Sequence, residues 1–115
     1  MRTERTDFDK VSVLRLSGEL TTRQCVDQLQ TSLVELLEGG RVEVVLNMSD
    51  VPCVSMLGLG ALVDRLSVFQ RFGGDIRFVG FSHQTGQLVR MTGLKGWLQV
   101  FDSEAQAIRT YRRAA

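Results

Sequence analysis

The chain has 115 residues, of which 43% are hydrophobic, and its 14 Lys and Arg against 13 Asp and Glu give a net charge of +1. A chain of this length is expected to form one domain, residues 1–115, that buries a core without disulfides or metals. The balanced charge gives no electrostatic basis for binding nucleic acid or an anionic membrane, so we expect a protein or a small ligand as partner. With neither a signal peptide nor an apolar run of about 18 residues, the expected location is cytoplasmic, without direct membrane insertion.

The amino-terminal half predicts a hairpin, a helix and a buried strand. Residues 11–17 are apolar and β-branched, and residues 2–8 are expected to pair with them as an edge strand. Thr21 or Thr22 can cap a helix that ends at Gly39 and Gly40, and its apolar residues recur every three or four positions: Val26, Leu29, Leu33, Leu36 and Leu37. Residues 41–47 then predict a parallel strand covered on both faces.

The carboxy-terminal half repeats this alternation. A helix is expected over 56–72, with Leu59, Leu62, Val63, Leu66 and Phe69 on one face, followed by a strand over 75–79. Ser82 can cap a short helix that carries Leu88 and Met91.

The last elements are a strand through 98–100 and a final helix that reaches about Tyr111. Ser103 and Gln106 have the spacing of a capping box at the start of that helix, and Arg109, Arg112 and Arg113 are expected to form its solvated end. The pattern predicts an α/β fold, a mixed, mostly parallel sheet of four to five strands with helices mainly on one face.

The stretch from Val51 to Leu62 departs from these local rules. Gly58 and Gly60 lie where a helix should begin, and an interior glycine costs up to about 1 kcal/mol relative to alanine, which suggests a constraint of packing or close approach. Ser55 is the only conventional cap candidate. Met56 and Leu57 follow it, and the sequence leaves open whether these side chains are buried or face a partner.

Little in the chain supports catalysis. The single histidine, His83, has no nucleophile beside it, and Cys25 and Cys53 lack metal-ligand spacing and are expected to be reduced and buried. No catalytic residue, metal site or cofactor is therefore expected. A nucleotide site would rest on Gly58 and Gly60 alone, without the Lys-Ser/Thr of a P-loop or a dinucleotide fingerprint. The aspartates Asp7, Asp9 and Asp50 are scattered and are expected to serve turns and solvation.

The order of several short motifs resembles the STAS-domain family, and within it the bacterial anti-sigma factor antagonists. Residues 13–20 are similar to the first core strand and its Gly-Glu-Leu turn, and 44–51 to the strand and loop before the regulatory site. Further similarity lies in residues 58–62 at the following helix start, in Gly73-Gly74 and in residues 91–94. The resemblance implies a single STAS-like domain spanning nearly the whole chain.

In that family the loop before Gly-Leu-Gly reads Asp-Ser-Ser, and a kinase that is also the anti-sigma factor phosphorylates the second serine. The resemblance places Ser55, Met56 and Leu57 at these positions, so Leu57 stands in place of the phosphoacceptor and the switch is degenerate. Thr21 also replaces an acidic residue of the family's Gly-Glu-Leu-Asp turn. Ser55 remains as a candidate displaced phosphoacceptor.

These features predict a non-catalytic protein-interaction module that binds an anti-sigma factor of the kinase-type ATPase fold and releases a sigma factor constitutively. Another STAS protein is a second candidate partner, and a homodimer is a further alternative. A different reading is a STAS scaffold or accessory subunit of a signalling complex or of a membrane lipid or anion transporter. The expected partner-binding loop and helix start comprise seven residues: Thr21, Ser55, Met56, Leu57, Gly58, Leu59 and Gly60.

Overall fold

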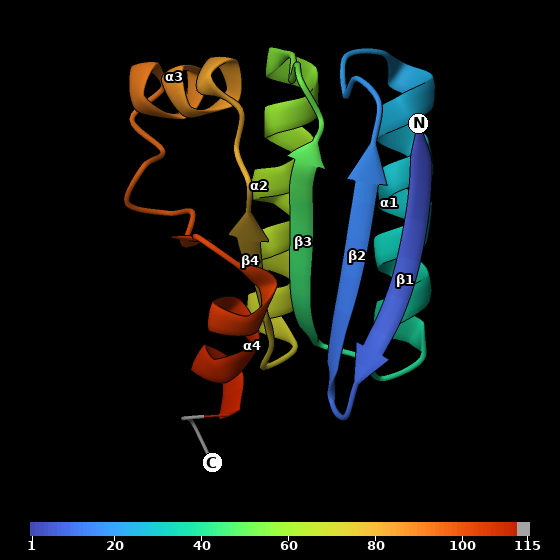
Figure 1. Cartoon of the computed structure of the whole chain (residues 1–115). Helices are drawn as coiled ribbons and strands as arrows, with labels where there is room; N and C mark the ends of the chain where they lie inside the picture. Colours follow the sequence, from blue (N-terminus) through green and yellow to red (C-terminus); the bar gives the residue numbers. More distant parts are fainter. Residues whose placement is uncertain (113–115) are drawn as a thin grey trace.

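The structure, a computed structural model, describes residues 1–112 and contains one five-stranded sheet with the strand order β1-β2-β3-β4-β5 (Figure 1). The strands are β1 (Arg2–Phe8), β2 (Val11–Ser17), β3 (Glu43–Asp50), β4 (Asp75–Val79) and β5 (Val100–Phe101). β1 pairs antiparallel with β2, and the remaining pairs are parallel. The predicted mixed, mostly parallel sheet is confirmed, although the last strand is shorter and lies further along the chain than expected.

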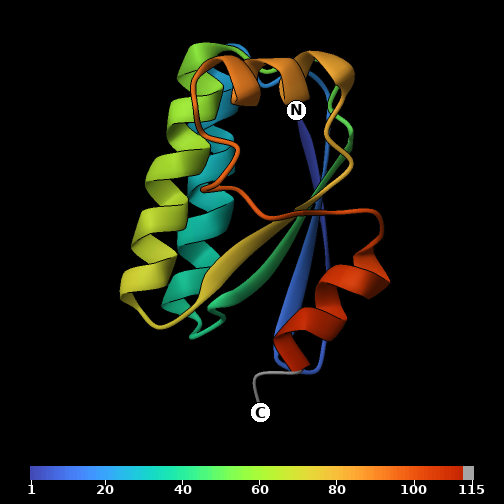
Figure 2. The same cartoon turned by 90° about the vertical axis from the view of Figure 1, so that its left-hand side faces the viewer.

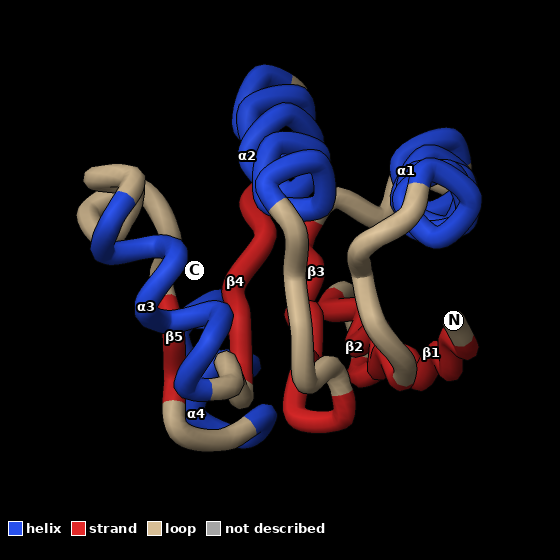
Figure 3. Tube along the Cα trace, turned by 90° about the horizontal axis from the view of Figure 1, so that it is seen from above, coloured by secondary structure: helices blue, strands red, loops and turns tan. Residues whose placement is uncertain are grey.

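The helices are α1 (Arg23–Glu38), α2 (Met56–Arg71), α3 (His83–Met91) and α4 (Glu104–Arg112). α1 and α2 lie side by side on one face of the sheet, as Figures 2 and 3 show from two directions. α4 covers the opposite face and contacts β2, β3, β4 and β5. α3 lies at the end of the sheet toward which β2, β3 and β4 point (Figure 1). The expected placement of helices on one face holds for α1 and α2, whereas α3 lies at the end of the sheet and α4 on the opposite face.

Two apolar cores result from this arrangement. The larger one, between the sheet and α1 with α2, includes Leu46, Leu62 and Phe78, all at 0% exposure. The smaller one lies under α4 and includes Val45 and Tyr111. Because neighbouring residues of a strand point to opposite faces, Leu46 and Val45 enter different cores, as predicted for a strand covered on both sides.

Polar contacts attach α4 to the sheet. Glu104 at its first turn accepts two hydrogen bonds from Arg15, from Nε at 2.8 Å and from Nη2 at 2.7 Å, and one from Asn47 Nδ2 at 2.6 Å. The Arg15 guanidinium holds the pKa of Glu104 below its usual range, although partial burial opposes this shift. At the other end of α4 the Tyr111 hydroxyl lies 2.7 Å from the Val44 carbonyl oxygen and 2.8 Å from that of Asp75, and its single proton is shared between these two acceptors.

Three of the predicted helix caps are present. Thr22, Ser55 and Ser82 accept a backbone N–H in the first turns of α1, α2 and α3. The predicted capping box is present in part, because Ser103 Oγ accepts from the Gln106 N–H, but Gln106 Oε1 accepts from the Asp102 N–H instead of that of Ser103.

The exposure of a few residues differs from the sequence reading. Met91 is 80% exposed, whereas Thr85 and Val89 form the buried side of α3. Cys25 and Cys53 are free thiols but are only half-buried, so the prediction that both are buried is wrong. Arg109 and Arg112 are exposed as expected, and Arg113 lies outside the described residues.

Candidate functional site

The segment that leads into α2 is held by an extension of the β2–β3 pairing. Beyond the named strands, Leu20 and Val54 form an isolated parallel bridge. The Leu20 N–H donates to the Cys53 carbonyl at 2.9 Å, and the Ser55 N–H donates to the Leu20 carbonyl at 3.1 Å. Leu20 and Val54 are both buried, so this bridge ties the connection after β2 to the loop after β3.

Ser55 begins α2 as its N-cap. Its side-chain oxygen accepts the Gly58 N–H at 3.2 Å, and its backbone has an extended conformation. A cap of this kind satisfies one of the amide groups that a helix start leaves without an intrahelical partner. The first helical residues, Met56 and Leu57, are therefore placed by a capped helix end. We use the name helix-entry segment for residues 53–57.

The two glycines of α2 have different roles. A Cβ atom on Gly58 would lie 2.5 Å from the Leu20 carbonyl oxygen and 3.0 Å from its Cγ atom, so only glycine allows this approach. A Cβ atom on Gly60 would meet nothing within 4 Å. The predicted packing constraint is thus present at Gly58 and absent at Gly60.

Met56 and Leu57 are exposed, which answers the question that the sequence left open. Their exposed fractions are 61% and 44%, whereas Leu59 in the same helix turn is 1% exposed. Gly58 is also buried, so Gly58 and Leu59 support this surface from below. The exposed residues of this helix start are Met56 and Leu57, with exposed Gly60 beside them along the helix.

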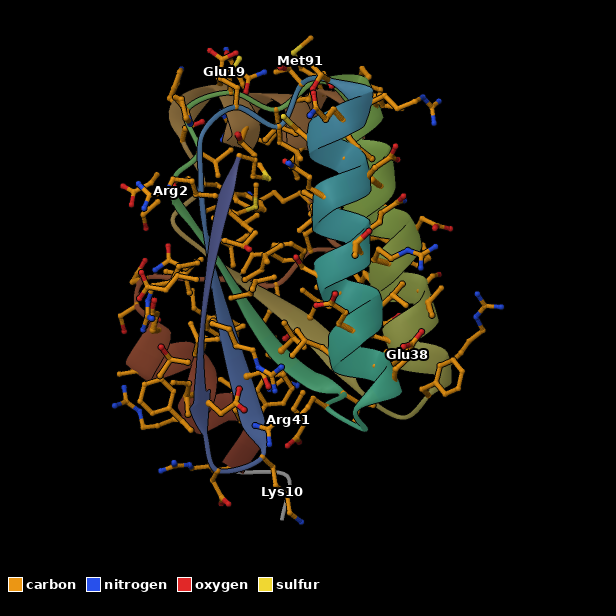
Figure 4. All side chains as sticks on the ribbon, turned by 90° about the vertical axis from the view of Figure 1, so that its right-hand side faces the viewer. Arg2, Lys10, Glu19, Glu38, Arg41 and Met91 are labelled. Carbon is orange, nitrogen blue, oxygen red and sulfur yellow. The ribbon has the colours of Figure 1, made fainter. Side chains whose placement is uncertain are left out.

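The surroundings of this surface show where it lies on the molecule. The connection after β2 contributes exposed Glu19 and half-buried Thr21. Figure 4 shows Glu19 and Met91 at one end of the molecule, and Glu38, Arg41 and Lys10 at the other. The helix-entry segment lies at the same end as Glu19, because α1 and α2 both begin there (Figure 1). The first turn of α2 carries no acidic residue, and its exposed large side chains, Met56 and Leu57, are apolar.

Sequence reasoning missed the contacts that the first turn of α3 and its cap make with the site. Gln84 Oε1 accepts the Val54 N–H at 2.9 Å, and Gln84 Nε2 donates to the Val54 carbonyl at 2.9 Å. The Ser82 hydroxyl donates to the Pro52 carbonyl at 3.0 Å. Both partners lie 30 residues away in the sequence. No local signal in the sequence could have identified these contacts, because they depend on how the chain returns past the end of the sheet.

His83 is exposed at the start of α3. Within residues 1–112, no group of three or more His, Cys, Asp or Glu is arranged to hold a metal ion. The Gly58 N–H is already bonded to Ser55, so it is not free to cradle a phosphate. None of the helices in the described part of the chain has the length and apolar character needed to span a membrane.

The fold and the site together define a small α/β domain with an exposed apolar helix start. The chain belongs to the STAS domain family, whose pattern matches residues 3–107. The chain is 28% identical over 97 residues to the anti-sigma-B factor antagonist of Staphylococcus aureus, covering 84% of this chain and 89% of the relative. It is 25% identical over 99 residues to the anti-sigma F factor antagonist of Paenibacillus polymyxa, covering 85% and 84%.

Solved structures confirm the fold. An anti-sigma factor antagonist from Mycobacterium paratuberculosis matches with a TM-score of 0.84 at 22% identity, over 96% of this chain and 93% of that one. The unphosphorylated anti-sigma factor antagonist SpoIIAA matches with a TM-score of 0.80 at 19% identity, over 96% of both chains. The murine anion transporter Slc26a9 matches with a TM-score of 0.78 at 19% identity, over 96% of this chain but only 19% of the transporter.

Proposed function

We propose that this protein is an anti-sigma factor antagonist that binds its partner through Met56 and Leu57 in a permanently non-phosphorylated state. The observation that carries the proposal is the exposure of these two large apolar side chains, 61% and 44%, on a helix start fixed by the backbone beneath it. The curated relatives named as anti-sigma factor antagonists support an anti-sigma factor as the partner, and the proposal assigns this partner a kinase-type ATPase fold.

The absence of a hydroxyl at Leu57 gives the proposed constitutive state its physical basis. A phosphate at the start of α2 would add nearly two negative charges to an apolar interface and would oppose docking. Leu57 cannot accept one and instead offers apolar area, which contributes about 1.5 to 3 kcal/mol when such a side chain passes from full exposure to full burial. Leu57 already has less than half of its surface exposed, so its own contribution is smaller.

Ser55 is the remaining hydroxyl of the segment, and its oxygen is engaged as the N-cap of α2. A kinase would therefore have to reach an oxygen that already accepts the Gly58 N–H. Incubation with the partner kinase and ATP, followed by mass spectrometry, is expected to show no phosphate on Ser55. The Leu57→Ser variant is expected to become phosphorylated at the new hydroxyl if the partner is a kinase. A phosphate on Ser55 of the wild type would overturn the non-phosphorylated state.

Affinity purification from native cells with the wild type and Leu57→Glu tests the binding surface. We expect the wild type to recover an anti-sigma factor, and Leu57→Glu to bind the purified anti-sigma factor at least about tenfold more weakly in calorimetry, because a carboxylate would be desolvated in the interface. Phe72→Glu is the matched control, since Phe72 is 65% exposed at the opposite end of the same helix. Equal affinity of Leu57→Glu and Phe72→Glu would refute the assignment.

A second candidate is an accessory role in a membrane transporter. The observation that favours it is the match to a part of Slc26a9 that makes up 19% of that transporter. Recovery of transporter subunits in place of an anti-sigma factor in the same purification would favour this function. Recovery of another STAS protein would instead indicate a scaffold complex.

A further inference from the structure

The Gln84 side chain occupies the place of a neighbouring strand beside the helix-entry segment. In the parallel bridge, Leu20 bonds to the backbone of Cys53 and Ser55, so the N–H and C=O groups of Val54 point to the other side. The carboxamide of Gln84 meets both of these groups at 2.9 Å. The segment is therefore bonded on both sides, by backbone on one and by a single side chain on the other.

The turn of α3 that carries Gln84 is itself anchored. Ser82 caps α3 by accepting the Thr85 N–H at 3.1 Å, and its hydroxyl donates to the Pro52 carbonyl at 3.0 Å. Thr85 is 1% exposed and fixes the turn against the domain. Gln84 thus extends from an anchored helix turn. Its two hydrogen bonds therefore hold the backbone of Val54 in place relative to α3.

We propose that Gln84 is a positioning residue that sets the direction in which α2 begins, and hence the presentation of Met56 and Leu57 to a partner. This inference rests on the proposed function for the role of that surface. The path is short: Gln84 fixes the peptide groups of Val54, Ser55 follows as the cap, and the two exposed apolar residues come next in the chain.

The chemistry of the contact requires a primary amide on a side chain of this length. Val54 presents one donor and one acceptor, and the Gln84 carboxamide offers the complementary pair. A glutamate would keep an acceptor for the N–H but would bring a carboxylate oxygen against the carbonyl. A leucine would leave both groups without a partner, and an unpaired buried backbone group is costly.

Amide hydrogen exchange on the isolated chain, followed by NMR, distinguishes two roles for Gln84. Gln84 either positions the whole helix-entry segment or only bonds to Val54. In Gln84→Leu, the Val54 amide loses its acceptor and its protection is expected to fall about 10- to 100-fold. The Ser55 amide bonds to Leu20 on the other side, so it is not a partner of Gln84. If Gln84 positions the segment, protection of the Ser55 amide falls as well, by about tenfold, while amides in the centre of β3 stay unchanged.

Gln84→Glu and Gln87→Leu complete the series. Gln84→Glu retains an acceptor for the Val54 N–H, yet the same loss of protection is expected at Ser55, because the carbonyl contact has become repulsive. Gln87 is exposed on the same helix, so Gln87→Leu is the matched control and is expected to exchange like the wild type. Wild-type protection of the Ser55 amide in both Gln84 variants would overturn the inference.

A binding experiment measures the affinity of these variants for the protein that the wild type recovers in the affinity purification. Gln84→Leu is expected to bind it about tenfold more weakly than Gln87→Leu does, since only a fraction of the molecules present the surface correctly. Unchanged affinity of Gln84→Leu alongside lost affinity of Leu57→Glu would overturn the inference and leave the proposed function intact. If Leu57→Glu also binds normally, the proposed function fails, and the exchange result at Ser55 still decides whether Gln84 positions the segment.

Discussion

Alanine substitutions at Gly58 and Gly60 test whether the start of α2 is as close to Leu20 as the structure indicates. Both glycines lie in the same helix, and replacing an unconstrained interior glycine with alanine stabilises a helix by about 0.5 to 1 kcal/mol. At Gly60 nothing lies within 4 Å of the added methyl group, so we expect this gain in the free energy of unfolding. At Gly58 the methyl group would lie 2.5 Å from the Leu20 carbonyl oxygen.

That oxygen cannot move freely, because it accepts the Ser55 N–H at 3.1 Å. Overpacking against such a rigid group costs about 1 to 3 kcal/mol, which exceeds the helical gain, so Gly58→Ala is expected to destabilise the protein by about 1 to 2 kcal/mol. The two variants should then differ by about 1.5 to 3 kcal/mol, or about 6 to 12 °C in thermal midpoint for a domain of this size.

Urea and thermal unfolding followed by far-ultraviolet circular dichroism measure this difference. Fluorescence is a weaker probe, because the single tryptophan, Trp97, is already 66% exposed in the folded chain. Gly60→Ala serves as the internal control for helix propensity. If Gly58→Ala is as stable as Gly60→Ala, the close approach to Leu20 does not exist in solution, and the backbone account of the helix start is wrong.

Two further predictions concern the attachment of α4. Glu104→Gln is expected to lower the urea midpoint at pH 7. Because Arg15 depresses the pKa of Glu104 in the folded state, the ionised Glu104 stabilises the protein above the usual pKa of 4.5, and this contribution is lost as the pH falls through the folded-state pKa. The difference in urea midpoint between the wild type and Glu104→Gln should therefore disappear at low pH. Tyr111→Phe should cost about 1 to 2 kcal/mol of unfolding free energy, measured by the same denaturation, since the buried carbonyls of Val44 and Asp75 lose a donor. Burial raises the pKa of Tyr111, the single tyrosine. The contribution of Tyr111 to the free energy of unfolding is therefore present below the usual pKa of 10.0 and is lost progressively as the pH rises above it. Phenolate absorbance should appear only when the chain unfolds, and titration of Tyr111 in the folded chain at a lower pH would contradict its burial.

The elements of the fold could be predicted because their signals are local. Thr22, Ser55 and Ser82 have side chains that accept backbone donors three residues ahead, and each begins a helix in the structure. The paired glycines at 39–40 and 73–74 follow the ends of α1 and α2. The spacing of apolar residues also identified the buried stripe of α1, in which Leu29 and Leu33 are fully buried.

The errors arose where burial depends on distant parts of the chain. α3 has nine residues, too few for periodicity to define a face, and its position at the end of the sheet buries Val89 and leaves Met91 in solvent. The location of β5 at Val100–Phe101 depends on pairing with Phe78 and Val79 in β4. This pairing depends on the path of the loop that follows α3. The local sequence around Val100 and Phe101 does not indicate that path.

The candidate site shows the same division between local and distant information. The cap and the unusual pair Met56 and Leu57 could be found from the sequence, but their exposure depends on which side of α2 faces the core. The role of Gly58 requires Leu20, and that of Val54 requires Gln84; both contacts join segments about 30 residues or more apart. A sequence reading therefore identifies the segment but not the supports that hold it.

Those supports explain why the identities of residues 56 and 57 can change without loss of the fold. The start of α2 is defined by backbone bonds between Leu20 and the segment, by the Ser55 cap and by the absence of a side chain at Gly58. None of these contacts uses the side chains of Met56 or Leu57. Met56 and Leu57 are 61% and 44% exposed on this support, so a partner that covered them would bury further apolar area and gain stabilisation. Under the proposed function, the backbone that would present a serine to a kinase presents Leu57 in this chain, a side chain without a hydroxyl group to phosphorylate.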